Sequence, residues 1–118
     1  MAVILGFGQS HIDKAKSVVN ELAEHLPKEN TKDFAEEFAL SQGTYDAPKN
    51  KFRIMRIRTV HTWEDYDEHW GCVIEGIYSC YRNDHPLSPD GFACLDIKFC
   101  LTIQEDDVWG KRVYCCIG

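Results

Sequence analysis

The spacing of apolar residues predicts two helices in the first part of the chain. From Ile12 to Leu26, apolar residues recur every three or four positions, which is the period of a helix with one buried face. Pro27 ends this segment, because proline cannot donate the hydrogen bond that a helix interior requires. A second helical pattern starts at Asn30 and ends before Gly43. We therefore expect two consecutive amphipathic helices.

Beyond these helices, the apolar period changes to that of a strand. Strands are predicted at about 51–58, 70–82, 92–103 and 108–117. Val3–Phe7 is a candidate fifth strand at the start of the chain. This order predicts an α+β fold, with two N-terminal helices packed on one face of a curved antiparallel sheet of four or five strands. The 118 residues are expected to form a single α+β domain, as their number is typical of one.

The alternation in the later strands also predicts how they pair. The register that buries the most apolar surface places Gly76 opposite Phe99, and it puts Cys80 and Cys94 on opposite faces of the sheet. The other parity would place these two cysteines directly across from each other. In the last strand, four side chains are predicted to point inward: Trp109, Val113, Cys115 and Ile117.

The first predicted strand contains a change of parity. Phe52 and Ile54 alternate with basic residues, and Met55 and Ile57 then continue the alternation one position out of step. One extra residue in a strand has this effect. We therefore predict a β-bulge between Ile54 and Met55.

The net charge of −6 disfavours general binding to the phosphate backbone of nucleic acids. However, residues 49–62 carry five basic side chains and no acidic one, whereas the segments on either side are acidic. Arg53, Arg56 and Arg58 therefore form a second candidate surface. The alternative is that these charges pair with the protein's own acids and protect the strand from pairing with other molecules.

The segment between the first two strands has the most unusual composition of the chain. It combines carboxylates with aromatic rings, and aromatic rings dominate binding hot spots while carboxylates attract a basic partner. The candidate partner-binding residues are Trp63, Glu64, Asp65, Tyr66, Asp67 and Glu68. The alternatives are a solvated acidic loop with its tryptophans in the core, and a calcium loop. Calcium is disfavoured because Trp70 stands where such a loop needs glycine.

The six cysteines suggest neither a metal site nor a cofactor. They include no Cys-x-x-Cys pair, and the N-terminal sequence lacks the features of a signal peptide or a membrane span. We therefore expect a cytoplasmic protein with reduced and mostly buried thiols. Cys72, Cys80 and Cys115 have the parity of inward-pointing residues.

No catalytic motif stands out in the sequence, although His61, His69 and His85 lie near strand ends. We expect a small, non-enzymatic binding protein of the inhibitor, immunity or adaptor type, a profile shared by viral counter-defence proteins of bacteriophages. Its partner would be a protein with a basic surface, such as a nucleic-acid-binding enzyme, and not nucleic acid or a membrane. The alternatives are a small-molecule-binding or hydrolytic pocket that uses His, Asp and Tyr side chains, and an oligomeric structural protein.

Overall fold

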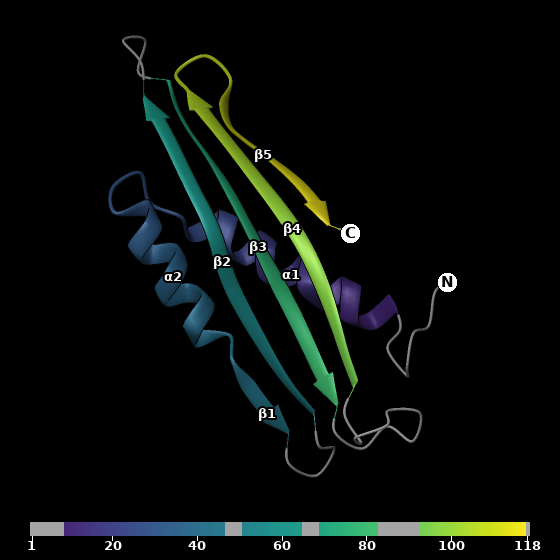
Figure 1. Cartoon of the computed structure of the whole chain (residues 1–118). Helices are drawn as coiled ribbons and strands as arrows, with labels where there is room; N and C mark the ends of the chain where they lie inside the picture. Colours follow the sequence, from purple (N-terminus) through teal and green to yellow (C-terminus); the bar gives the residue numbers. More distant parts are fainter. Residues whose placement is uncertain (1–8, 47–50, 65–68, 83–92, 118) are drawn as a thin grey trace.

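The computed structural model describes residues 9–46, 51–64, 69–82 and 93–117. Within these residues, two helices precede five strands. The helices are α1 (Gln9–His25) and α2 (Thr31–Ser41), and the strands are β1 (Thr44–Asp46), β2 (Lys51–Glu64), β3 (Trp70–Arg82), β4 (Ala93–Asp106) and β5 (Gly110–Ile117). All strands pair antiparallel in chain order, and both helices lie on one face of the curved sheet (Figure 1). The predicted α+β fold is confirmed.

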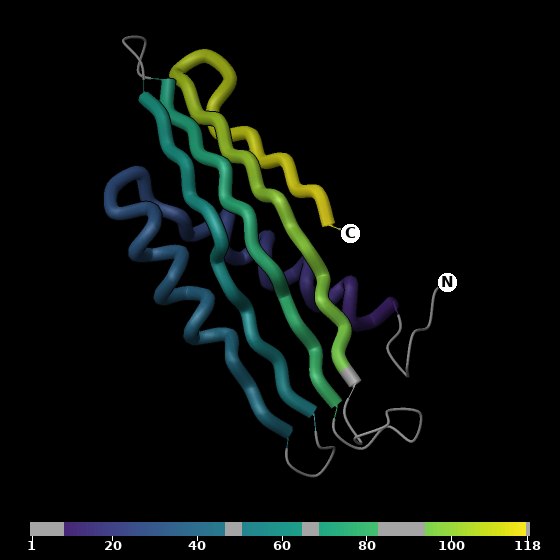
Figure 2. Tube along the Cα trace, in the orientation of Figure 1, coloured from purple at the N-terminus to yellow at the C-terminus, as the bar shows by residue number. Residues whose placement is uncertain are grey.

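The hydrophobic core lies between the helices and the sheet. Helix α1 packs against β4 and β5, and α2 packs against β2. The long strands bend along their length, as the trace in Figure 2 shows. The molecule measures 57 × 28 × 19 Å, and its smallest dimension fits one helix layer on one sheet. The largest fully buried side chains are Tyr78, Leu22, Ile74, Leu101, Ile103, Val18, Val19 and Cys72.

A short connection fixes the relative position of the two helices. Asn30 adopts the left-handed conformation, with φ of 54°, which asparagine tolerates better than most residues. The buried Thr31 then donates its hydroxyl to the carbonyl oxygens of Pro27 at 3.0 Å and of Lys28 at 3.2 Å. These bonds provide carbonyl groups of the connection with a donor from the first residue of α2.

The pairing of β3 with β4 follows the predicted register. Gly76 lies opposite Phe99, and Cys80 and Cys94 lie on opposite faces. Gly76 is required at its position, because an added Cβ would overlap with the Phe99 ring and with the backbone carbonyl oxygen of Arg56 on β2. Three strands therefore approach closely at this one residue.

The β-bulge of β2 lies at Arg58, so the prediction between Ile54 and Met55 is wrong. Pairing with β3 is regular through Met55 and shifts only between residues 57 and 59. Ile57 and Val60, which are three positions apart, both pack against the core because the bulge shifts the alternation there. Ile54 lies on the opposite face of the sheet from Met55, and the strand needs no bulge between them.

The ends of the sheet differ from the prediction in two respects. Thr44–Asp46 is a strand that was not predicted, and it pairs with the first residues of β2. The candidate strand Val3–Phe7 lies outside the described residues and stays a prediction. Strand β5 begins at Gly110. Its Val113 and Cys115 have the predicted parity, but both are exposed because β5 is the last strand and has a neighbour on one side only.

All six cysteines are free thiols. Cys72 and Cys80 are buried as predicted, and burial raises the pKa of the Cys72 thiol to about 11. Cys115 and Cys116 are exposed, so the expectation of mostly buried thiols is wrong for β5. Of the helices that the structure describes, neither α1 nor α2 has the length and apolar character needed to cross a membrane.

The contact at Gly76 predicts a large effect of a small substitution. Gly76→Ala should lower the free energy of unfolding by about 2–3 kcal/mol, because the core is already filled at this position. Gly43→Ala is the matched control, since its Cβ would meet neighbouring atoms only at ordinary contact distances of 3.6 Å and more. It should change stability by less than about 1 kcal/mol. Urea denaturation measures both, and equal effects would contradict the close approach.

Candidate functional site

Two connections leave the sheet at the same end. The pairing register aligns Glu64 of β2 with Trp70 of β3, and Trp70 with Glu105 of β4. The connection between β2 and β3 and the turn between β4 and β5 therefore start from one row of residues across the sheet. Residues 63–64 and 105–110 are called the turn end below.

The predicted partner-binding residues fall partly at the turn end. Trp63 and Glu64 are the last residues of β2, and Glu64 is exposed. The half-buried Trp63 ring lies over Gly71 so closely that a Cβ on Gly71 would overlap it. Trp63 therefore supports the β2–β3 pairing. The other four candidates lie outside the described residues: Asp65, Tyr66, Asp67 and Glu68.

One carboxylate organises the β4–β5 turn. Asp106 Oδ1 accepts the backbone N–H of Val108 at 2.9 Å and of Trp109 at 2.6 Å. Asp106 Oδ2 accepts a hydrogen bond from the Arg112 guanidinium at 2.8 Å. The Trp109 N–H, followed by the Val108 N–H and the Arg112 charge, holds the pKa of Asp106 below its usual range. The turn is therefore held by the ionised form of Asp106.

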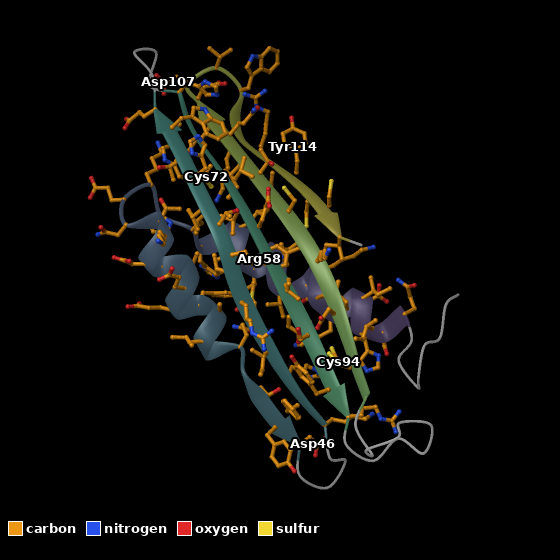
Figure 3. The ribbon with its side chains drawn as sticks, in the orientation of Figure 1. Asp46, Arg58, Cys72, Cys94, Asp107 and Tyr114 are labelled. Atoms are coloured by element: carbon orange, nitrogen blue, oxygen red, sulfur yellow. The ribbon has the colours of Figure 1, made fainter. Side chains whose placement is uncertain are left out.

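The turn carries two exposed apolar side chains. Val108 is 81% exposed and Trp109 is 75% exposed, and Asp107 beside them marks this end of the sheet in Figure 3. Gly110 then adopts φ of +69°, a left-handed conformation that glycine enters without strain. The prediction that Trp109 points inward from a strand is wrong, because the Asp106 hydrogen bonds place it in the turn. Val108 and Trp109 therefore present adjacent apolar side chains to solvent at a turn that hydrogen bonds hold in place.

The turn end is attached to the helix layer. Lys111 Nζ donates a hydrogen bond to the carbonyl oxygen of Ala23, in the last turn of α1, at 2.7 Å. Helix carbonyls carry partial negative charge at this terminus, which favours the contact with an ammonium group. Lys28 and Glu105 also form an ion pair at 3.5 Å, with side chains 56% and 34% exposed. These contacts connect the β4–β5 hairpin to α1 and to the connection that follows it.

The second candidate surface is divided between different parts of the molecule. Arg53 is half-buried on the helix-facing side, where it pairs with Cys80 of β3. Arg56 is exposed on the opposite side and donates to the Tyr81 hydroxyl at 3.2 Å. Arg58 occupies the bulge and is exposed. These three arginines do not form one continuous basic surface.

Two of the candidates for a pocket, His61 and Tyr78, do not converge. His61 is exposed on the open face of the sheet, the face without helices, whereas Tyr78 is buried on the helix-facing side. Burial raises the pKa of Tyr78 above its usual value. His85 lies outside the described residues. Within the described part of the chain, no group of three or more His, Cys, Asp and Glu side chains is arranged to hold a metal ion.

A polar cluster outside the predicted sites connects β3 and β4. Ser79, which is fully buried, donates its hydroxyl to Asp96 at 2.7 Å, and the Cys94 thiol donates to the same carboxylate oxygen at 3.2 Å. The Ser79 bond, and then the Cys94 bond, hold the pKa of Asp96 below its usual range. Burial raises the pKa of Cys94 to about 11, so this thiol is protonated near neutral pH. The predicted register already placed Ser79 opposite Asp96.

Comparison with known proteins does not assign this chain to a family. No protein-family model matches its sequence, and no curated protein shows significant similarity to it. The geometry of the turn end is therefore the basis on which a function can be proposed for this protein.

The hydrogen bonds of Asp106 predict how the β4–β5 turn responds to substitution. In Asp106→Ala, the backbone amides of Val108 and Trp109 should exchange faster with solvent, because they lose their acceptor. Asp106→Asn keeps an acceptor oxygen and should stay closer to the wild type. Amide hydrogen exchange followed by NMR measures the difference, and equal protection in all three proteins would contradict this account of the turn.

The same turn should depend on pH in the acid range. The pKa of Asp106 is lower in the folded protein than in the unfolded chain. Ionised Asp106 therefore contributes fully to the stability of the turn when the pH is above the ordinary Asp pKa. This contribution is lost as the pH falls through the lowered pKa of the folded state.

Proposed function

We propose that this protein is a small binding protein of the inhibitor, immunity or adaptor type that acts by protein–protein contact through the turn end. The observation that carries the proposal is the exposed pair Val108 and Trp109 on a turn held by Asp106. Tryptophan is among the residues most enriched in binding hot spots. Because the turn is already ordered, little conformational entropy of the turn is lost when a partner binds the indole ring.

The charges at the turn end indicate the chemistry of the partner. Asp107 is exposed next to the apolar pair, and Glu64 is exposed at the same end of the sheet, where the sequence that follows it contains three more acidic residues before His69. Asp106 pairs with Arg112 and Glu105 pairs with Lys28, and Glu64 and Asp107 remain as exposed acids of the turn end. Such a surface is complementary to an apolar pocket with a basic rim. Enzymes that bind nucleic acids carry basic surfaces of this kind.

Trp63 and Trp109 have different roles at the turn end. Trp63 packs on Gly71, so its removal would disturb the sheet as well as any interface. Trp109 is exposed, so its removal tests binding without a change in the core. Trp109, and not Trp63, is therefore the decisive position for the test.

We expect Trp109→Ala to weaken binding to the partner by about 2 kcal/mol or more, with no change in the melting temperature. Tyr114→Ala is the matched control, because Tyr114 is 53% exposed on β5 away from the turn end. It should bind like the wild type. The partner is first isolated by affinity capture from the native host and identified, and affinities are then measured by calorimetry with the purified partner. Equal affinity of both variants would refute the site.

The acidic residues should act mainly on the association rate. Replacing Glu64 and Asp107 by Gln and Asn should slow association and reduce its dependence on salt, because long-range attraction accelerates the encounter of opposite charges. Glu36→Gln with Glu37→Gln, on the exposed face of α2, removes the same net charge at another place and is the control. Association kinetics at two salt concentrations distinguish a local effect from a general one. If the control slows association as much, the turn end is not where the partner approaches.

A further inference from the structure

Two cysteines face each other across the last two strands. The β4–β5 register pairs Cys100 directly with Cys116, so both side chains lie on the open face of the sheet. Cys116 is exposed and Cys100 is half-buried. The Cα atoms of directly opposed residues in an antiparallel pair are about 4.5 or 5.5 Å apart, depending on the position in the ladder. Both values fall within the range of about 4.4–6.8 Å that a disulfide spans.

No other two of the six cysteines share such a position. Cys72 and Cys80 are buried on the helix-facing side, where β4 places Ile103 and Leu95 opposite them. Cys115 precedes Cys116 but lies on the other face, opposite Leu101. Cys94 shares the open face with Cys100, but six residues of extended strand separate the two by about 20 Å. The facing arrangement is therefore specific to Cys100 and Cys116.

The facing thiols are accessible to a small molecule. They line an open surface hollow of about 400 Å³ together with Glu75, Lys98, Phe99 and Ile117. Lys98 and Glu75 supply one charge of each sign at this hollow. Such a rim is suited to a zwitterionic reagent, such as the disulfide form of a small thiol peptide.

We propose that Cys100 and Cys116 are a reversible dithiol–disulfide pair whose oxidant is a low-molecular-weight disulfide. The exposed Cys116 thiolate attacks one sulfur of the reagent, forms a mixed disulfide and releases one small thiol. The Cys100 thiolate then attacks the Cys116 sulfur, forms the Cys100–Cys116 bond and releases the second small thiol. The two protons lost by the cysteines are carried by the two released thiols. Two protein thiols are thus oxidised, and one small disulfide is reduced to two thiols.

The bridge would close the open end of the β4–β5 hairpin. The Asp106 hydrogen bonds hold the turn, and the Cys100–Cys116 pair lies at the opposite end of the strand pairing. A disulfide between these positions restricts the unfolded chain and leaves the opposed strands in place, so oxidation should stabilise the fold. This inference does not depend on the proposed function, because it concerns the chain without a partner.

The test uses the full-length protein equilibrated with oxidised and reduced glutathione, followed by trapping of the remaining thiols and mass spectrometry. We expect an intramolecular bridge that connects the Cys100 peptide to the C-terminal peptide, and a melting temperature several degrees above that of the reduced protein. Cys115→Ser should retain both properties. Cys116→Ser and Cys100→Ser should lose both, while the reduced variants keep the wild-type circular dichroism spectrum.

Cys115 and Cys116 are a matched pair, because they are adjacent and both exposed but lie on opposite faces of β5. In each single variant, only one cysteine is left in the C-terminal peptide, so the mass of the bridged peptides identifies the residue. A bridge that persists in Cys116→Ser and disappears in Cys115→Ser would overturn the proposal. So would glutathione adducts without any bridge, or bridges formed only between molecules.

Discussion

The close approach of three strands at Gly76 determines the rest of this structure. Phe99 of β4 covers the glycine on one side, and the Arg56 carbonyl of β2 approaches it on the other, so no side chain can be accommodated. A shift of the register by one residue would move Phe99 away from the glycine and turn the apolar face of β4 toward solvent. The same β3–β4 register aligns Trp70 with Glu105 at the turn end, and the β2–β3 pairing beyond the bulge at Arg58 aligns Glu64 with Trp70. One packing constraint near the centre thus positions the candidate site at the end.

The two faces of the sheet are stabilised in different ways. The helix-facing side is filled by aliphatic and aromatic residues that α1 and α2 cover. The open face is held by contacts between neighbouring strands, such as the stacked rings of Phe52 and Tyr81 at 4.5 Å and the Ser79–Asp96 hydrogen bond. Apolar residues on both faces obscure the alternation along β2. This explains why parity alone placed the bulge at Ile54 instead of Arg58.

The sequence was sufficient to predict the fold where one face of an element is uniformly apolar. The bounds of β3, the pairing of Gly76 with Phe99 and the burial of α1 all follow from such patterns. The predictions are wrong where a side-chain hydrogen bond or the end of a strand determines the conformation or the burial of a residue. The alternation of apolar and polar residues predicts that Trp109 points into the core. In the structure, the hydrogen bond from its backbone N–H to the Asp106 carboxylate holds it in the turn. Asp106 followed by Gly110 was the local signal for that turn.

Strand β5 contributes little to the core, yet it has several specific contacts. Its side chains are exposed or half-buried, so hydrophobic burial alone does not explain its position. Lys111 attaches it to α1, Arg112 pairs with Asp106, and Cys116 faces Cys100. This strand is held by polar contacts, and the turn before it carries an exposed tryptophan. Both features differ from the burial of apolar side chains that stabilises most strands. Such departures are expected where a protein maintains a functional surface, and they make the β4–β5 hairpin the element in which binding and thiol chemistry are best sought.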